Sequence, residues 1–206
     1  GNRIASRNPV QNGMELERGS KAVTSLISPP GALPAGFISP RDLKPGLTLV
    51  TGPRDSGKTR WCMRLAESAR AAGMDLRGLV SPALMEGGEK SGYELLDLGS
   101  GERRRLAWRP GEGQGSLATE HWHMAEETME WGNGILRGIR NCDIFILDEI
   151  GPLELERGLG LTAGLEFVDA NRNTPCFVAV RPSLVEKAGK RWNWAEILVL
   201  NAEAVS

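Results

Sequence analysis

The sequence has no long run of apolar residues, and none approaches the roughly 18 residues of a membrane-spanning helix. Its first residues also lack the apolar centre of a secretory signal peptide. Neither sign of charge is in excess, because 25 Lys and Arg face 26 Asp and Glu and give a net charge of −1. The chain as a whole therefore does not attract nucleic acid or a membrane surface, and we expect neither as a partner.

Cysteine and histidine are scarce. Cys62, Cys142 and Cys176 stand far apart, each within an apolar stretch, which is typical of core residues in a reducing compartment and argues against a disulfide framework. We therefore expect a cytoplasmic protein. His121 and His123 are two residues apart and have no further ligand near in sequence, so a local structural role is favoured over a metal site.

What the sequence does contain is a phosphate-binding motif. Leu47 to Val50 is a short apolar run that predicts a buried strand. Gly52 follows soon after, then four intervening residues, and then Gly57, Lys58 and Thr59, which is the spacing G-x-x-x-x-G-K-[ST]. An amphipathic segment comes next, so the motif has both the strand and the helix that it requires.

Each part of this motif has a physical role. Glycines let the backbone approach a ligand closely, and successive N–H groups together with the positive helix N-terminus favour an anion. We expect Lys58 to reach the β- and γ-phosphates and the Thr59 hydroxyl to ligate Mg²⁺. The predicted nucleotide-binding residues are Gly52, Pro53, Arg54, Asp55, Ser56, Gly57, Lys58, Thr59 and Arg60. The chain is thus predicted to bind a nucleoside triphosphate such as ATP or GTP.

Two acidic residues, Asp148 and Glu149, close the strongest predicted strand, residues 143–147. An acid at the end of such a strand meets the Mg²⁺ held by Thr59. Because successive strand side chains alternate, Glu149 points elsewhere, where it could orient and deprotonate a water beside the γ-phosphate. The alternative is that the pair merely ends the strand in solvent.

Phosphoryl transfer also needs positive charge against the γ-phosphate. Arg181 is the favoured residue because it follows a core strand, although it could equally be a surface ion-pair residue. Arg54 and Arg60 flank the loop and come next. A basic cluster predicts either a solvated strand edge or a mobile phosphate lid. Its members are Arg103, Arg104, Arg105 and Arg109.

Strands alternating with helices over residues 47–206 predict a three-layer α/β domain with ligands at the carboxyl ends of the strands. Residues 1–46 contain several prolines and are expected to form an extended or partly disordered leader. Residues 85–91 are expected to be a polar, glycine-rich loop. Residues 93–98 and 103–108 predict an inserted antiparallel hairpin, so the sheet is mainly parallel but mixed.

The stretch from 147 to 155, Leu-Asp-Glu-Ile-Gly-Pro-Leu-Glu-Leu, resembles the Asp-Glu-Ile-Gly-x-Met/Leu-Glu-Leu signature of the THEP1-type nucleoside-triphosphatases. Residues 78–98 and the phosphate loop are similar to the same family, and the likeness spans roughly residues 47–201. The resemblance implies a RecA-like P-loop core and slow, Mg²⁺-dependent hydrolysis of several nucleoside triphosphates to diphosphate and phosphate. Two stretches depart from the family pattern, residues 53–56 inside the loop and residues 83–85. The departure at residues 83–85 bears on the preference for the nucleobase and on the turnover rate.

By motif match, the resemblance implies that Asp148 is the magnesium-side acid and Glu149 the base. The leading hypothesis is a triphosphatase with Lys58, Glu149 and Arg181 as catalytic residues. A nucleotide or small-molecule kinase with the arginine-rich hairpin as its lid is the second. A nucleotide-gated interaction module is the third, with residues 29–45 as the contact for a protein partner of unknown identity.

Overall fold

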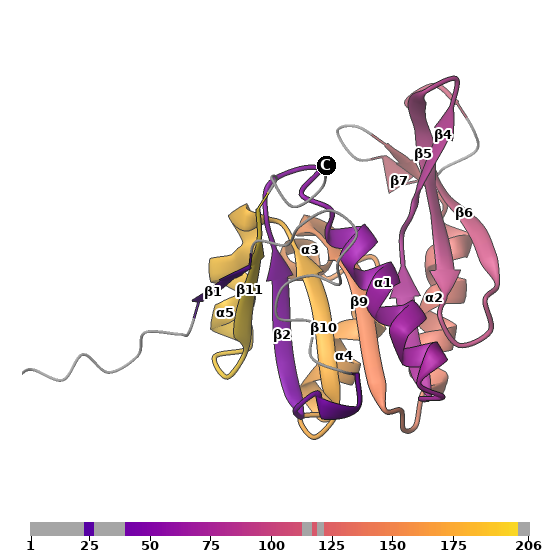
Figure 1. The fold of residues 1–206 in the computed structure, drawn as a ribbon. Helices are drawn as coiled ribbons and strands as arrows, with labels where there is room; N and C mark the ends of the chain where they lie inside the picture. Colours follow the sequence, from indigo (N-terminus) through magenta and orange to yellow (C-terminus); the bar gives the residue numbers. More distant parts are fainter. Residues whose placement is uncertain (1–22, 27–39, 113–116, 119–121, 202–206) are drawn as a thin grey trace, which may run out of the picture.

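The computed structural model describes residues 23–26, 40–112, 117–118 and 122–201, which form one mixed sheet with helices on both faces (Figure 1). One half of the sheet is parallel, with each strand hydrogen-bonded to the next. In spatial order these strands are β1 (Val23–Leu26), β11 (Glu196–Leu200), β2 (Gly46–Thr51), β10 (Pro175–Val180), β9 (Ile144–Ile150) and β3 (Leu76–Val80).

The other half of the sheet is antiparallel and begins where β5 pairs with β3. It continues through β5 (Glu89–Asp97), β6 (Arg103–Trp108), β8 (His123–Met124) and β7 (Leu117–Ala118), with β4 (Ala83–Glu86) paired to β5 off this path. The β4–β5 hairpin rises beyond the parallel strands, at the same end of the molecule as the loop before α1 (Figure 1). The predicted mixed sheet is therefore confirmed, and the predicted antiparallel hairpin is the one formed by β5 and β6.

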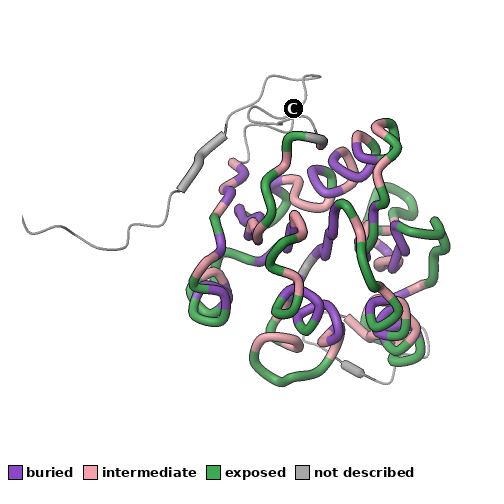
Figure 2. The backbone as a smooth tube through the Cα atoms, turned by 90° about the horizontal axis from the view of Figure 1, so that it is seen from below, coloured by how far each residue is buried: buried purple, intermediate pink, exposed green. Residues whose placement is uncertain are grey.

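Helices complete the three layers. They are α1 (Lys58–Ala71), α2 (Glu126–Gly138), α3 (Pro152–Arg157), α4 (Thr162–Ala170) and α5 (Val185–Arg191), with two short 3₁₀ helices, η1 (Pro40–Asp42) and η2 (Pro182–Leu184). The apolar residues of α1 pack on one face of the sheet, whereas those of α2, α4 and α5 pack on the other. Figure 2 shows the consequence, with buried residues on the inner sides of the helices and exposed residues outside. Among the described residues, no helix has the length and apolarity needed to cross a bilayer.

Strand β9 lies at the centre because its sequence is apolar on both faces. Ile144 and Ile146 belong to the core beneath α1, and Phe145 and Leu147 to the core on the opposite face. Such a continuous apolar run is typical of a parallel strand covered by helices on both sides. The parallel strands on either side of β9 run in the same direction as β9, so their carboxyl ends lie at one common edge of the sheet.

One sequence-based expectation is wrong. Residues 85–91 are not a loop but the turn and flanking strand ends of the β4–β5 hairpin. The turn is made by Gly87 and Gly88, which have φ of +60° and +84°. Two residues with positive φ give a turn whose twist matches a two-stranded ribbon, and glycine adopts that conformation without a Cβ clash. This hairpin matters because it stands beside the phosphate loop.

The division of the chain at residue 46 stays a prediction. Within the range expected to be a leader, the structure describes β1 and η1, and β1 is part of the sheet, with Val23 paired to Ile197 and Leu26 to Leu200.

Candidate functional site

The loop between β2 and α1 is shaped by its two glycines. Gly57 immediately precedes α1 and has φ of +84°. This is a left-handed backbone conformation, which favours glycine. At Gly52 the limit is space, because a Cβ there would run into the carbonyl oxygen of Leu200 and lie 2.6 Å from Ser56 Oγ. The backbone of β11 is hydrogen-bonded to β2 and cannot move away. Both motif glycines are therefore required by the geometry of the loop.

The Lys58 ammonium lies over this loop. Its Nζ donates hydrogen bonds to the carbonyl oxygens of Gly52, at 2.9 Å, and of Pro53, at 3.0 Å. The first turn of α1 contains no acidic residue, so the positive end of the helix is not neutralised from within. Positive charge from the helix and from the lysine thus converges on this loop, which favours the binding of an anion there.

Two hydroxyl groups at this site have unused hydrogen-bonding capacity. The Oγ of Ser56 and the Oγ1 of Thr51 are buried and make no hydrogen bond within the described part of the chain. Buried polar groups normally have partners, so both hydroxyl groups are free to bond to a ligand held by the loop. Thr59, the second residue of α1, is half-buried.

Asp148 is buried, with 1% of its surface exposed, at the end of β9. Its Oδ2 accepts a hydrogen bond of 3.4 Å from the backbone N–H of Ser81, which follows the neighbouring strand β3. Burial raises the pKa of Cys62 well above its usual value, and the nearby Asp148 raises it further, whereas Lys58 lowers it. The charges of Asp148 and Lys58 therefore both act on the buried thiol of Cys62 on α1. The phosphate loop and Asp148 thus lie at the same edge and on the same face of the sheet.

At Asp148 and Glu149 the strand carries one extra residue. Leu147 pairs with Val178 and Ile150 with Val180, so three steps along β9 match two along β10. Strict alternation therefore does not hold here, and Leu147 and Ile150 both belong to the same core cluster. Bulges of this kind re-aim side chains beside functional sites. The side chain of Glu149 lies outside the described residues, so its assignment as the base stays a prediction.

Arg181 directly follows β10 at this same edge, where it precedes η2 and its carbonyl oxygen accepts a hydrogen bond of 2.9 Å from Leu184 N–H. It is exposed, as are Arg54 and Arg60. The roles of these three arginines toward the γ-phosphate stay predictions.

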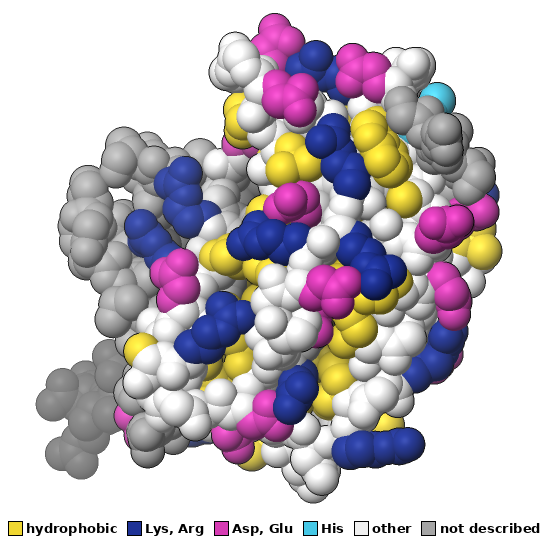
Figure 3. Space-filling view, turned by 90° about the vertical axis from the view of Figure 1, so that its right-hand side faces the viewer, with side chains coloured by type: hydrophobic (Ala, Val, Ile, Leu, Met, Phe, Trp, Pro, Cys, Tyr) yellow, Lys and Arg dark blue, Asp and Glu magenta, His cyan; other side chains and the backbone are white. Residues whose placement is uncertain are grey.

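The basic cluster on β6 is matched by acids of its own sheet. The ion pairs are Arg103–Glu94 at 2.9 Å, Arg104–Glu102 at 2.9 Å, Arg105–Glu86 at 4.0 Å and Arg109–Glu89 at 3.0 Å. Figure 3 shows basic and acidic side chains interspersed on the face of the molecule toward the hairpin. This pairing favours the solvated-edge interpretation of the cluster over the lid.

Sequence reasoning missed Lys90, which the hairpin brings to the loop. Its Nζ lies 3.9 Å from Oδ1 of Asp55, a residue 35 positions earlier that occupies the middle of the phosphate loop. The only signal in the sequence was the Gly87-Gly88 pair, which predicts a tight hairpin and hence a folded-back strand carrying Lys90.

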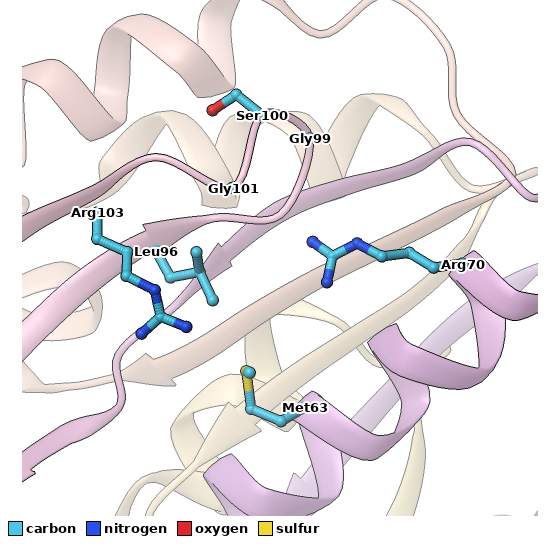
Figure 4. Close-up of a pocket in the computed structure, with 7 residues that line it drawn as sticks. All are labelled: Met63, Arg70, Leu96, Gly99, Ser100, Gly101 and Arg103. Atoms are coloured by element: carbon cyan, nitrogen blue, oxygen red, sulfur yellow. The ribbon is translucent and has the colours of Figure 1, made fainter.

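A cavity of about 220 Å³ lies elsewhere, between α1 and the β5–β6 turn (Figure 4). Its charged lining residues are Arg70 and Arg103, which lie on either side of Leu96. Arg70 donates a hydrogen bond of 2.7 Å to the Leu98 carbonyl oxygen, and Arg103 is paired with Glu94. None of the expected nucleotide-site residues lines this cavity, so it is separate from the candidate site.

A strand–loop–helix phosphate motif beside a parallel sheet, with a buried acid at the end of a second strand, defines a P-loop NTPase fold. The crystal structure of THEP1 from Aquifex aeolicus has this fold and is similar to the chain with a TM-score of 0.58 at 16% identity, over 77% of this chain and 92% of that one.

The sequence comparisons agree. The family model described as NTPase matches residues 48–173. Nucleoside-triphosphatase THEP1 of Methanopyrus kandleri is 29% identical over 140 residues, which are 66% of this chain and 73% of the relative. That of Ignicoccus hospitalis is 32% identical over 131 residues, 64% of this chain and 72% of the relative. The chain belongs to the NTPase family and is, as a member of it, a hydrolase.

Proposed function

We propose that the chain hydrolyses nucleoside triphosphates, ATP and GTP among them, to the diphosphate and inorganic phosphate with Mg²⁺ as cofactor. One observation carries the proposal most directly: the Lys58 ammonium and the N-terminus of α1 converge on a glycine-shaped loop at the sheet edge that also bears the buried Asp148. Family membership, and the name nucleoside-triphosphatase that the relatives bear, support the same activity.

The residues at this edge fit Mg²⁺ by their chemistry. A threonine hydroxyl and a carboxylate are the hard oxygen donors that Mg²⁺ prefers, and this ion usually takes its other ligands from phosphates and water. In keeping with that, no cluster of three or more His, Cys, Asp or Glu occurs among the described residues that would form a complete protein cage. Thr59 and Asp148 would hold the ion, which would neutralise negative charge on the triphosphate.

The reaction then uses the chain's own groups in distinct roles. Backbone N–H groups of residues 52–59 bind the phosphate oxygens, and Lys58 turns from the loop carbonyls to the β- and γ-phosphates. Glu149 orients a water molecule and accepts its proton as the water oxygen bonds to the γ-phosphorus. The bond from that phosphorus to the bridging oxygen breaks, and the diphosphate leaves. Arg181 stabilises the charge on the transferring group.

Single-turnover hydrolysis of ATP and GTP, measured beside nucleotide binding, tests these roles. We expect Glu149→Gln to bind nucleotide normally and to lose about 100-fold or more in rate, as general-base catalysis predicts. Lys58→Ala is expected to lose both binding and turnover. Glu166→Gln is the matched control, because Glu166 is exposed on α4, on the opposite face from α1. Wild-type turnover in Glu149→Gln would show that the base is assigned to the wrong residue.

The two alternatives are separable from hydrolysis by simple additions. A kinase would consume ATP only when a nucleoside, a monophosphate or another acceptor is supplied. A nucleotide-gated interaction module would turn over very slowly until its protein partner is added. We therefore expect that a panel of acceptors does not change phosphate release from ATP. The reason is that Arg103, Arg104 and Arg109 are paired with acidic side chains nearby rather than presented to an acceptor.

A further inference from the structure

The β4–β5 hairpin presents one cation to the phosphate loop. Lys90 lies at the start of β5, just after the hairpin turn, and its ammonium is 3.9 Å from the carboxylate of Asp55. Figure 1 shows the tip of this hairpin and the loop before α1 at the same end of the molecule. The contact joins an inserted structural element to the motif that defines the candidate site.

Lys90 is held firmly in this position. Its carbonyl oxygen accepts a hydrogen bond of 2.9 Å from Arg109 Nε, which fixes the strand from the β6 side. Its ammonium lies 3.4 Å from the Tyr93 hydroxyl and 5.3 Å from the centre of the Tyr93 ring. Tyr93 in turn packs edge-on against Trp122, with ring centres 4.9 Å apart. Arg109 therefore fixes the position of β5, and Lys90 is the residue of β5 whose positive charge faces the phosphate loop.

The partner, Asp55, is unexpected in a phosphate-binding loop. It has φ +61° and is the only residue other than glycine with positive φ among those the structure describes. Its side chain is 79% exposed, whereas that of Lys90 is 29% exposed. A carboxylate in this place repels a polyphosphate, and at 3.9 Å it gives the more buried ammonium only a weak, solvent-screened ion pair. Phosphate oxygens would be stronger partners for the same ammonium.

We infer that Lys90 is a polyphosphate-binding residue supplied by the hairpin, and that Asp55 holds its ammonium until the phosphate tail of a nucleotide replaces the carboxylate. This inference rests on the proposed function, which it extends by assigning the hairpin a place in substrate binding. The exchange costs little because the ion pair being broken is weak. It also gives the loop carboxylate a physical reason to be there.

The first experiment measures binding of a non-hydrolysable ATP analogue and of inorganic tripolyphosphate, both with Mg²⁺, by displacement of a fluorescent nucleotide. Lys90→Ala is expected to weaken both ligands about tenfold, as for the loss of a charge-assisted hydrogen bond. Lys90→Arg should retain most of the affinity. Loss for the ATP analogue without loss for tripolyphosphate, or no loss for either, would overturn the assignment.

Controls separate this inference from the proposed function. Lys190→Ala removes an equally charged side chain from an exposed ion pair with Glu186 on α5 and should leave both affinities unchanged. If wild type fails to bind ATP with Mg²⁺, the proposed function fails. If wild type binds, Lys58→Ala does not and Lys90→Ala equals wild type, only the role of Lys90 fails. Thermal unfolding of each variant verifies that the fold is intact.

A double-mutant cycle tests the exchange itself. Asp55→Asn keeps a residue type that tolerates positive φ but removes the charge. In wild type it is expected to strengthen tripolyphosphate binding about threefold, because Lys90 no longer has a competing partner. In Lys90→Ala the same change should have a much smaller effect. An equal gain in both backgrounds would mean that Asp55 acts only by direct repulsion, and would overturn the exchange.

Discussion

The backbone N–H of Ser81 points at the carboxylate of Asp148, with 3.4 Å between the nitrogen and Oδ2. Ser81 directly follows β3, and Asp148 lies near the end of the neighbouring parallel strand β9. The pairing of these strands therefore orients the acid. Asp148 is almost fully buried and raises the pKa of Cys62 on α1, so its carboxylate lies on the α1 side of the sheet rather than in solvent. This hydrogen bond connects the buried acid to the end of the neighbouring strand β3.

The first prediction concerns Asp148. Asp148→Asn keeps the size of the side chain and removes the charge that we assign to Mg²⁺. Turnover with Mg²⁺ is expected to fall about 10–100-fold, the range found when a group that supports a metal is lost. The Mg²⁺ concentration for half-maximal rate should rise, whereas Glu166→Gln should leave both quantities unchanged. Steady-state hydrolysis over a Mg²⁺ series measures this, and an unaltered Mg²⁺ dependence would contradict the role.

The second prediction compares Gly52, whose surroundings leave no room for a Cβ, with Gly134, where a Cβ would meet open space. Gly52→Ala is expected to destabilise the fold by about 1–3 kcal/mol and to abolish nucleotide binding, because the added methyl group overlaps the Leu200 carbonyl oxygen. Gly134→Ala meets no atom within 4 Å on the exposed face of α2 and should stabilise by up to about 1 kcal/mol through helix propensity. Urea unfolding and nucleotide titration measure both; equal effects would refute the steric argument.

The third prediction concerns Glu154, which holds the bend after β9. Its carboxylate accepts hydrogen bonds from the N–H of Gly151, at 2.9 Å, and of Leu161, at 3.0 Å. Glu154→Ala leaves both donors without this partner, and we expect a loss of about 2 kcal/mol in the free energy of unfolding. Turnover should also fall, with little change in nucleotide affinity, because the bend adjoins the acid pair.

The matched variant for that test is Glu156→Ala, two residues along the same helix. Glu156 makes an exposed ion pair with Lys187 at 3.3 Å, which is expected to contribute less than about 1 kcal/mol. If the two variants unfold at the same urea concentration, the Glu154 carboxylate does not organise the bend.

The fourth prediction is a pH dependence of stability. Burial first, and the neighbouring Cys142 second, raise the pKa of Cys176 from 9.0 to about 12. Below pH 9 the thiol is protonated in both states and contributes no pH dependence. Between pH 9 and 12 it ionises only in the unfolded chain, so the free energy of unfolding falls by up to about 1.4 kcal/mol per pH unit.

Urea unfolding at pH 8, 9 and 10 measures this slope. Cys176→Ala and Cys176→Ser should both show a shallower decline than wild type, even though they differ from each other in stability at pH 7. Parallel declines in wild type and both variants would contradict the assignment to this thiol.

The parts of the fold that were predictable are those with a local cause. The apolar run of β9 and the loop between β2 and α1 are each encoded in a few consecutive residues, and the three-layer fold with its mixed sheet is confirmed. Helix α3 was missed because it has only six residues and none is buried, and it begins with a capping box in which the Glu154 side chain accepts a hydrogen bond from Gly151 N–H.

The unpredicted features of the site depend on contacts between distant residues. The contact between Lys90 and Asp55 requires both the Gly87-Gly88 turn and the strand pairing that carries the hairpin to the loop. Likewise, the bulge at Asp148 appears only when β9 is aligned with β10, since neither sequence alone reveals a difference in step number. Pairing register across a sheet is a tertiary property, so periodicity within one strand could not provide it.

The pairing of β1 with β11 has a practical consequence for anyone who shortens this polypeptide. A truncated version starting at residue 40 would retain the phosphate loop and both acids, yet it would uncover the outer hydrogen-bonding groups of β11 that Val23–Leu26 otherwise occupies. An uncovered edge strand can pair with other chains, so such a version is expected to self-associate more strongly than the longer form.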